Sequence, residues 1–128
     1  MKKKAVDYTN IISFEKAYES LPKDDEDVVN YDKAKAAGLA DHTMAELELI
    51  IIIKVVNPED FKVDFDDTNE KWSPWFQYGQ SGFRFVYSFF TFTYSYPYLC
   101  SRLCLSDEKR SDFMGKTFLS TYKRFLIK

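Results

Sequence analysis

The stretch 81-SGFRFVYSFFTFTYSYPY-98 decides how this chain folds, because nine of its eighteen residues are aromatic. Aromatic residues occupy every odd position from 83 to 89, which is the two-residue period of a β-strand. From 90 to 98 they occupy the even positions, and one strand cannot keep both sets on the same face. We therefore predict a β-bulge near residues 89–90, or a strand that ends there.

The residues on either side predict two more strands. The segment 79-GQSG-82 holds two glycines and is typical of a hairpin turn. Residues 74–78 before it predict a short edge strand, where proline is tolerated. After a second turn at 95–97, residues 98–105 predict a third strand, which gives a small antiparallel meander.

Helices are predicted on both sides of this meander. Ser13 begins a short helix that Pro22 ends, and the acidic residues 23–32 predict a solvated linker or turn. Asp41 or Thr43 can cap a central helix that runs to about Val56, where Asn57-Pro58 follows. A buried strand over 47–53 is the alternative, because β-branched residues are dense there, but the length of the segment favours a helix.

The last segment, 106–126, is the clearest amphipathic helix. Ser106 supplies a capping hydroxyl, and two acids follow it. Gly115 lies on the apolar arc and would let the helix approach the sheet closely. The apolar arc contains Met114, Phe118, Leu119, Tyr122, Phe125 and Leu126, and the basic arc contains Lys109, Arg110, Lys116, Lys123, Arg124 and Lys128.

This order predicts an α+β fold of N-terminal helices, a three-stranded antiparallel meander and a C-terminal amphipathic helix packed on the sheet. The 128 residues favour a single domain spanning 1–128, with residues 1–12 as a loose arm. We expect one set of aromatic side chains to fill the core and the other to be half-covered by helices. The alternative is an exposed surface that stacks bases or sugars.

Composition disfavours several classes of protein. The formal net charge of −2 argues against a protein that binds nucleic acid by bulk charge, and the apolar runs are too short to span a bilayer. In a strand, Cys100 and Cys104 would have Cα atoms roughly 13 Å apart, too far for a disulfide. We expect two reduced thiols and no metal or cofactor.

Several short motifs occur in order along the chain: 74-PWF-76, 81-SGF-83, 101-SRLC-104 and 115-GK-116 with Phe118 and Tyr122. In this pattern, and in 14-FEKA-17, the sequence resembles a family of small uncharacterised proteins of gut Bacteroidales and their bacteriophages. After S-R-L-C that family usually carries an aromatic or Lys-rich link, whereas this chain has Leu105-Ser106-Asp107. The resemblance implies a phage or mobile-element origin, in the host cytoplasm or the virion, and supplies no catalytic residue.

Two clusters of charged residues are candidate surfaces for binding a partner, although a purely solvated surface is the alternative for each. One is the acidic connector 57–71, which contains Asp60, Asp64, Asp66, Asp67 and Glu70. Its carboxylates could mimic the phosphates of a nucleic acid, but without a glycine in 60–70 it does not predict a calcium site. The other is the basic arc, in which Lys116 and Lys123 could contact phosphates or an acidic partner, with Phe113 as an apolar contact.

No catalytic motif occurs in the sequence. His42 has no catalytic neighbours by motif, and Arg102 is expected to pair with an acid from 59–70. We therefore predict a non-enzymatic accessory protein of a phage or mobile element that binds another protein, such as a host defence or replication factor that it inhibits. The alternatives are a virion component that forms a homo-oligomer and a single-stranded nucleic-acid-binding module. A membrane partner is not expected.

Overall fold

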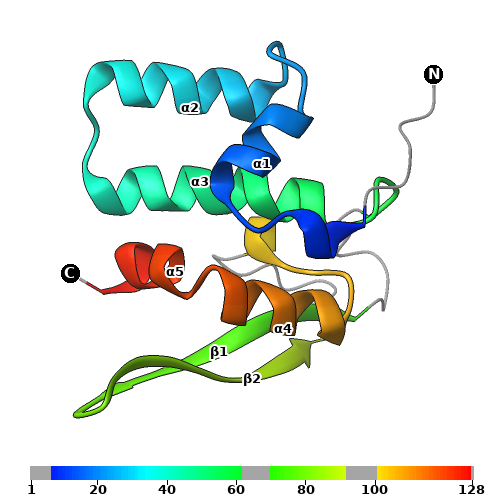
Figure 1. Ribbon diagram of the computed structural model, residues 1–128, viewed down its shortest axis with the longest axis vertical. Coiled ribbons are helices and arrows are strands. Elements are labelled where there is room, and N and C mark those ends of the chain that lie inside the picture. The colour runs from blue at the N-terminus through cyan, green and yellow to red at the C-terminus, as the bar shows by residue number, and fades with distance from the viewer. Residues whose placement is uncertain (1–6, 62–69, 92–100, 128) are drawn as a thin grey trace.

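The structure is a computed structural model that describes residues 7–61, 70–91 and 101–127, and its elements lie in three tiers (Figure 1). In the first tier α1 and α2 pack on α3, which in turn packs on α5 of the second tier. The second tier contains α4 and α5. The third tier is the two-stranded hairpin of β1 and β2, on which α4 lies. The elements are η1 (Tyr8–Asn10), α1 (Phe14–Ser20), α2 (Glu26–Ala37), α3 (Asp41–Val56), β1 (Lys71–Gly79), β2 (Gly82–Thr91), η2 (Ser101–Leu103), α4 (Glu108–Thr117) and α5 (Leu119–Leu126).

The α+β class is confirmed, but the acidic linker predicted over 23–32 is wrong from Glu26 onward. The carboxylate of Asp25 accepts hydrogen bonds from the backbone amides of Asp27 (2.9 Å) and Val28 (3.3 Å) and so caps α2. Acidic residues are favourable in the first turn of a helix, where the backbone amides leave partial positive charge. The acidic run is therefore the start of a helix.

The central helix is confirmed as α3, and the alternative strand over 47–53 is wrong. Ile51, Ile52 and Ile53 are all buried, because α1 and α2 cover one side of α3 and α5 covers another. The predicted cap is wrong, since α3 follows Ala40 without a side-chain cap. Asp41 accepts hydrogen bonds from the guanidinium of Arg124 instead.

The predicted hairpin is confirmed, and the predicted third strand is wrong in its described part. β1 and β2 pair antiparallel around the two-residue turn between Gly79 and Gly82. Residues 101–103 form the short helix η2, and Leu105 makes one isolated bridge through reciprocal backbone hydrogen bonds with Trp72 (2.8 and 2.9 Å). The turn at 95–97 and Cys100 lie outside the described residues, and Cys104 is buried as a thiol.

The bulge lies earlier in β2 than the sequence predicts. Trp75 pairs with Tyr87 and Phe76 pairs with Phe85, which leaves Val86 as the extra residue. An extra residue reverses which side chains face inward. Phe85 therefore faces α4, whereas Tyr87 faces the opposite side.

The middle of the inner face packs on the helices as the sequence predicts, whereas Tyr78 and Phe90 on the same face are 63% and 44% exposed. Phe76 contacts Tyr122 of α5 at 4.7 Å between ring centroids and stacks on Phe83 at 4.9 Å. A Cβ atom added at Gly115 of α4 would lie 2.3 Å from Phe85 Cδ1 and 3.0 Å from Pro74 Cβ. The expected close approach of helix and sheet at this glycine is confirmed.

The single C-terminal helix predicted over 106–126 is wrong, because Phe118 interrupts it. Phe118 has φ −110° and ψ 30°, and its buried side chain contacts Phe113. The break lets α4 follow the sheet while α5 turns onto α3. The predicted cap is also shifted by one residue, since Asp107 accepts the hydrogen bond from the Arg110 amide at 2.9 Å.

The predicted loose arm is shorter than residues 1–12. Ile11 is buried, and the ring of Tyr8 lies 5.3 Å from that of Phe113 and 4.5 Å beneath the guanidinium carbon of Arg110. Apolar burial therefore fixes residues 8–11, and residues 1–6 lie outside the described part of the chain.

The contact at Gly115 predicts that Gly115→Ala destabilises the protein. Alanine would gain about 1 kcal/mol of helix propensity, but overpacking against Phe85 and Pro74 costs about 1–3 kcal/mol. We expect a net loss of about 1 kcal/mol in urea unfolding. The control Lys116→Ala, at the exposed neighbouring position, should stay within about 0.5 kcal/mol of wild type. Equal or higher stability for Gly115→Ala would contradict the close approach.

Candidate functional site

The strongest candidate site is the hairpin face that points away from α4, called here the outer aromatic face. It is built from three neighbouring cross-strand pairs, Ser73–Phe89, Trp75–Tyr87 and Gln77–Arg84. The helices α4 and α5 pack on the opposite face, through Gly115 and Tyr122. No helix in the described part of the chain packs on the outer aromatic face.

The rings of the outer aromatic face reach solvent. Trp75 and Tyr87 have exposed fractions of 50% and 53%, and Val86 beside them is 41% exposed. The Trp75 and Phe89 rings meet edge to face with centroids 5.3 Å apart. Large apolar groups gathered on one exposed face mark an interaction surface more often than rings scattered singly do.

The bulge and α4 together hold this face in place. Ser88, next after Tyr87, turns inward, where its hydroxyl donates to the carboxylate of Asp112 (2.6 Å) and is hydrogen-bonded to the Ser111 hydroxyl (2.7 Å). Because Ser88 is anchored to α4, Tyr87 and Phe89 on either side of it must point outward. The sequence grouped Tyr87 with Phe83 and Phe85 on one covered face, and this expectation is wrong for Tyr87, which is exposed on the outer aromatic face. Residues 92–98 of the second aromatic set lie outside the described residues.

The two edges of the hairpin are less suited to pairing with another strand. On β1, the backbone of Trp72 is already hydrogen-bonded to Leu105, and Pro74 lacks an amide hydrogen. On β2, the bulge at Val86 interrupts the regular spacing of backbone groups. Proline and bulges on edge strands are recognised protection against strand addition. Within the described residues, the outer aromatic face is therefore a stronger candidate for binding than either edge of the hairpin.

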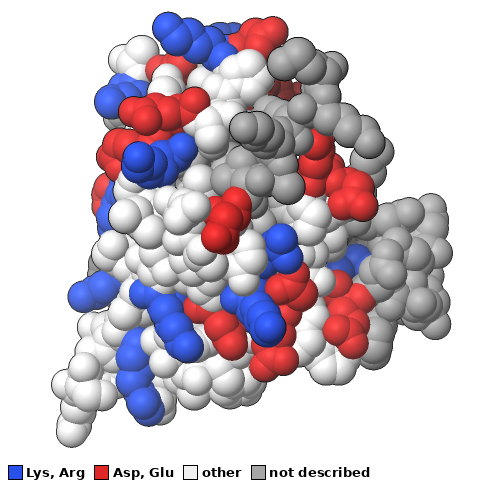
Figure 2. Space-filling view, turned by 45° about the vertical axis from the view of Figure 1, so that its right-hand side comes forward, with Lys and Arg blue, Asp and Glu red and all other residues white. Residues whose placement is uncertain are grey.

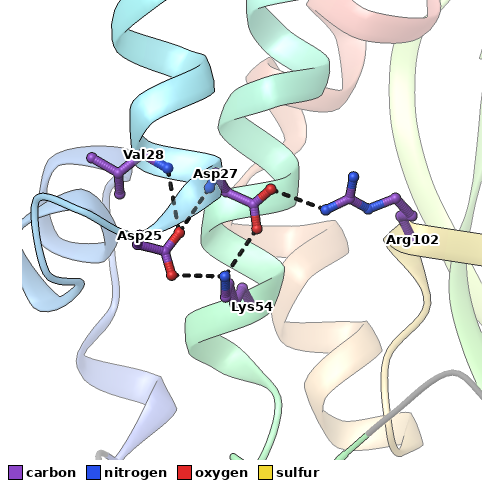
Figure 3. A network of polar contacts seen from close by, with 5 residues as sticks. All are labelled: Asp25, Asp27, Val28, Lys54 and Arg102. Carbon is purple, nitrogen blue, oxygen red and sulfur yellow. Dashed lines mark hydrogen bonds and ion pairs between the residues drawn. The ribbon is translucent and has the colours of Figure 1, made fainter.

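A second polar cluster ties the helical tier together (Figure 3). The buried carboxylate of Asp27 accepts hydrogen bonds from Lys54 of α3 (3.0 Å) and from Arg102 of η2 (3.0 Å), and Lys54 also pairs with Asp25 (2.7 Å). Arg102 was expected to pair with an acid from 59–70, and it pairs with Asp27 of α2. Three of the expected acids, Asp64, Asp66 and Asp67, lie outside the described residues. The paired charges of this cluster join three elements, which is a structural role.

The acidic candidates are brought together only in part. Asp60 is exposed, and Glu70 is exposed while accepting a hydrogen bond from the indole of Trp72 at 3.0 Å. Asp64, Asp66 and Asp67 lie outside the described residues. No group of His, Cys, Asp or Glu that could hold a metal ion occurs within residues 7–61, 70–91 and 101–127.

The basic arc divides into engaged and exposed residues. Arg124 binds Glu48 of α3 through both carboxylate oxygens (2.8 and 2.9 Å), and Arg110 donates to the Val56 carbonyl at 2.8 Å. Lys116 and Lys123 are exposed. Phe113 is half-buried against Tyr8, so most of the apolar contact predicted for a partner is used inside the fold.

Comparisons with protein-family models, with curated proteins and with solved structures found no match for this chain. None of the helices in its described part is both long enough and apolar enough to cross a membrane. The site must therefore be interpreted from its own residues.

Sequence reasoning did not single out Trp75, Tyr87 or Arg84 as site residues. One signal that could have found them was charge: residues 71–106 contain no Asp or Glu, although the chain has 20 of these residues. A segment rich in aromatic residues and free of carboxylates differs from an ordinary solvated strand.

Two helix caps predict how stability changes with pH. Burial alone would raise the pKa of Asp25, but hydrogen bonds from Lys54 and from the amides of Asp27 and Val28 outweigh it and hold the pKa below its usual value. The pKa of Asp107 is lowered in the same way: burial opposes the shift, and the amide and guanidinium of Arg110 outweigh it.

Because both folded-state pKa values lie below the unfolded value of about 3.9, their stabilisation is complete above that pH. It is lost as the pH falls through the lower folded-state values. Urea unfolding at a series of acidic pH values should show this loss, and Asp25→Asn should reduce it because asparagine keeps the cap without the charge. An unchanged acid slope in Asp25→Asn would show that this ionic contact contributes nothing.

Proposed function

We propose that this protein is a non-enzymatic accessory protein that binds another protein through the outer aromatic face of its hairpin. The observation that carries the proposal is the half-exposure of Trp75 and Tyr87 on a sheet face that no described helix covers. Tryptophan, tyrosine and arginine are the residue types that contribute most to protein interfaces, whereas lysine and acidic residues are depleted at interface centres. The outer aromatic face has this composition.

The position of these residues also suits binding. The face is supported from behind by α4, through Gly115 and the hydrogen bonds of Ser88. A rigid support lowers the entropy lost when a partner binds, because the contact side chains are already in place. The resemblance to phage and Bacteroidales proteins makes a host protein the natural partner in this proposal, with inhibition of a defence or replication factor as its purpose.

A homo-oligomer, such as a virion component would form, is the second candidate, because two copies could cover their exposed rings against each other. A single-stranded nucleic acid is less favoured, since the outer aromatic face carries one exposed cation, Arg84, among the described residues. Single-strand binders combine stacking rings with a basic groove that follows the phosphates.

The experiment compares the loss of two exposed rings on the hairpin with the loss of an equally exposed apolar side chain elsewhere. Tagged wild type, a Trp75→Ala/Tyr87→Ala double variant and Leu126→Ala are cross-linked in lysate of a Bacteroidales host, and captured proteins are quantified by mass spectrometry. Leu126 is 50% exposed on α5, as Trp75 is on β1, and so controls for general stickiness. We expect the partner to be reduced about tenfold or more in the double variant and retained by Leu126→Ala.

The captured protein must then be purified and its affinity for each variant measured, with circular dichroism to show that the variants are folded. Capture that does not depend on Trp75 and Tyr87 contradicts the proposal. Sedimentation of the purified protein tests the second candidate: self-association that the double variant abolishes would favour the homo-oligomer.

A further inference from the structure

Arg84 is the exposed charged residue of the outer aromatic face, and its position is defined. It lies opposite Gln77, one same-face pair along from Trp75 and Tyr87, which is about 7 Å along the strand. Its guanidinium donates a hydrogen bond to the side-chain carbonyl of Gln77. This contact orients the group beside the exposed rings.

Most of the donor capacity of Arg84 is unused within the described structure. A guanidinium has five N–H donors in a planar fork that matches a carboxylate in two-point contact, and Gln77 accepts from one nitrogen. The acids beside the described hairpin are Glu70 and Asp112, and their carboxylates already accept hydrogen bonds from the indole of Trp72 and the hydroxyl of Ser88. Arg84 thus resembles one half of an ion pair whose acid comes from outside.

The distribution of charge along the chain supports the same partner chemistry. Residues 71–128 contain nine Lys or Arg against three Asp or Glu, a formal charge of +6, whereas residues 1–70 carry −8. Of these cations, Arg102 and Arg124 are already paired with acids of residues 1–70. In Figure 2 the end of the hairpin projects as a largely uncharged surface, and the charged side chains nearest to it in that view are Lys and Arg. Such a surface attracts an acidic partner and repels a basic one.

We infer that Arg84 is a specificity-determining residue and that the partner is a protein surface presenting a carboxylate beside an apolar site for Trp75. This inference rests on the proposed function and adds the chemistry of the partner. A nucleic acid would need cations spaced along its phosphates, but Lys116 and Lys123 belong to the helices on the other side of the sheet. One carboxylate needs only one arginine.

The test uses a display library of random short peptides, selected on the full chain and counter-selected on Trp75→Ala. We expect the enriched peptides to combine Asp or Glu with neighbouring aliphatic or aromatic residues. Arg84→Ala should weaken binding of a synthetic enriched peptide roughly thirtyfold or more, as truncating an interface hot spot does. Arg84→Lys should restore only part of the affinity, because lysine keeps the charge but lacks the planar fork.

Two controls accompany the measurement. Lys123→Ala removes an exposed cation from α5 and should leave peptide binding unchanged. Replacing the acid of the peptide by its amide should weaken binding to the wild-type protein about as much as Arg84→Ala does. The same replacement should hardly weaken binding to the Arg84→Ala variant, because the two changes remove the same contact.

Each contrary result identifies what fails. Enriched peptides that lack acids and bind Arg84→Ala as well as wild type overturn this inference while the proposed function stands. Binding of an oligothymidylate probe that depends on Trp75 overturns both, in favour of nucleic acid. Self-association that depends on Trp75 assigns the face to a second copy and also overturns both. No enrichment at all refutes the proposed function, and this inference with it.

Discussion

The close contact of Gly115 with Phe85 and Pro74 is the constraint on which the rest of this structure depends. Because Gly115 has no side chain, α4 lies near enough to the hairpin for Ser88 to reach Ser111 and Asp112. That contact fixes which residues of β2 face inward. The helix break at Phe118 then turns α5 onto α3 while Tyr122 of α5 still contacts Phe76 of the sheet, so the sheet is joined to the helical tier through one continuous segment.

Features set by neighbouring residues could be predicted from the sequence, and features set by distant partners could not. The cap at Ser13, the turn around Gly82 and the end of α3 at Asn57 each depend on a few adjacent residues, and they were predicted correctly. The start of α2 was missed because the acidic run was interpreted by composition alone. Asp27 in that run is buried and forms ion pairs with Lys54 and Arg102, which lie 27 and 75 positions further along the chain. A local sequence pattern does not contain such distant partners.

The candidate site shows the same limit more sharply. The two-residue period correctly placed residues 83–89 in a strand, but it grouped Tyr87 with Phe85 on one face. The bulge at Val86 separates them, and its position follows from the register with β1 and from the anchoring of Ser88 on α4. A shift of a few residues in the position of one bulge therefore changes Tyr87 from a core residue into a surface residue.

The exposed rings need a reason beyond the stability of the hairpin. Cross-strand aromatic pairs contribute about 0.2–1 kcal/mol each, and an isolated two-stranded hairpin is at best marginally stable, so Trp75 and Tyr87 do help to hold the strands together. The inner face already provides this support through Phe76, Phe83 and Tyr122. A β-branched residue at position 75 would pair well across the strands while exposing less apolar surface. This is the physical basis of the proposal that a partner covers Trp75, because burial of the remaining ring surface would gain the free energy that such a large side chain can supply.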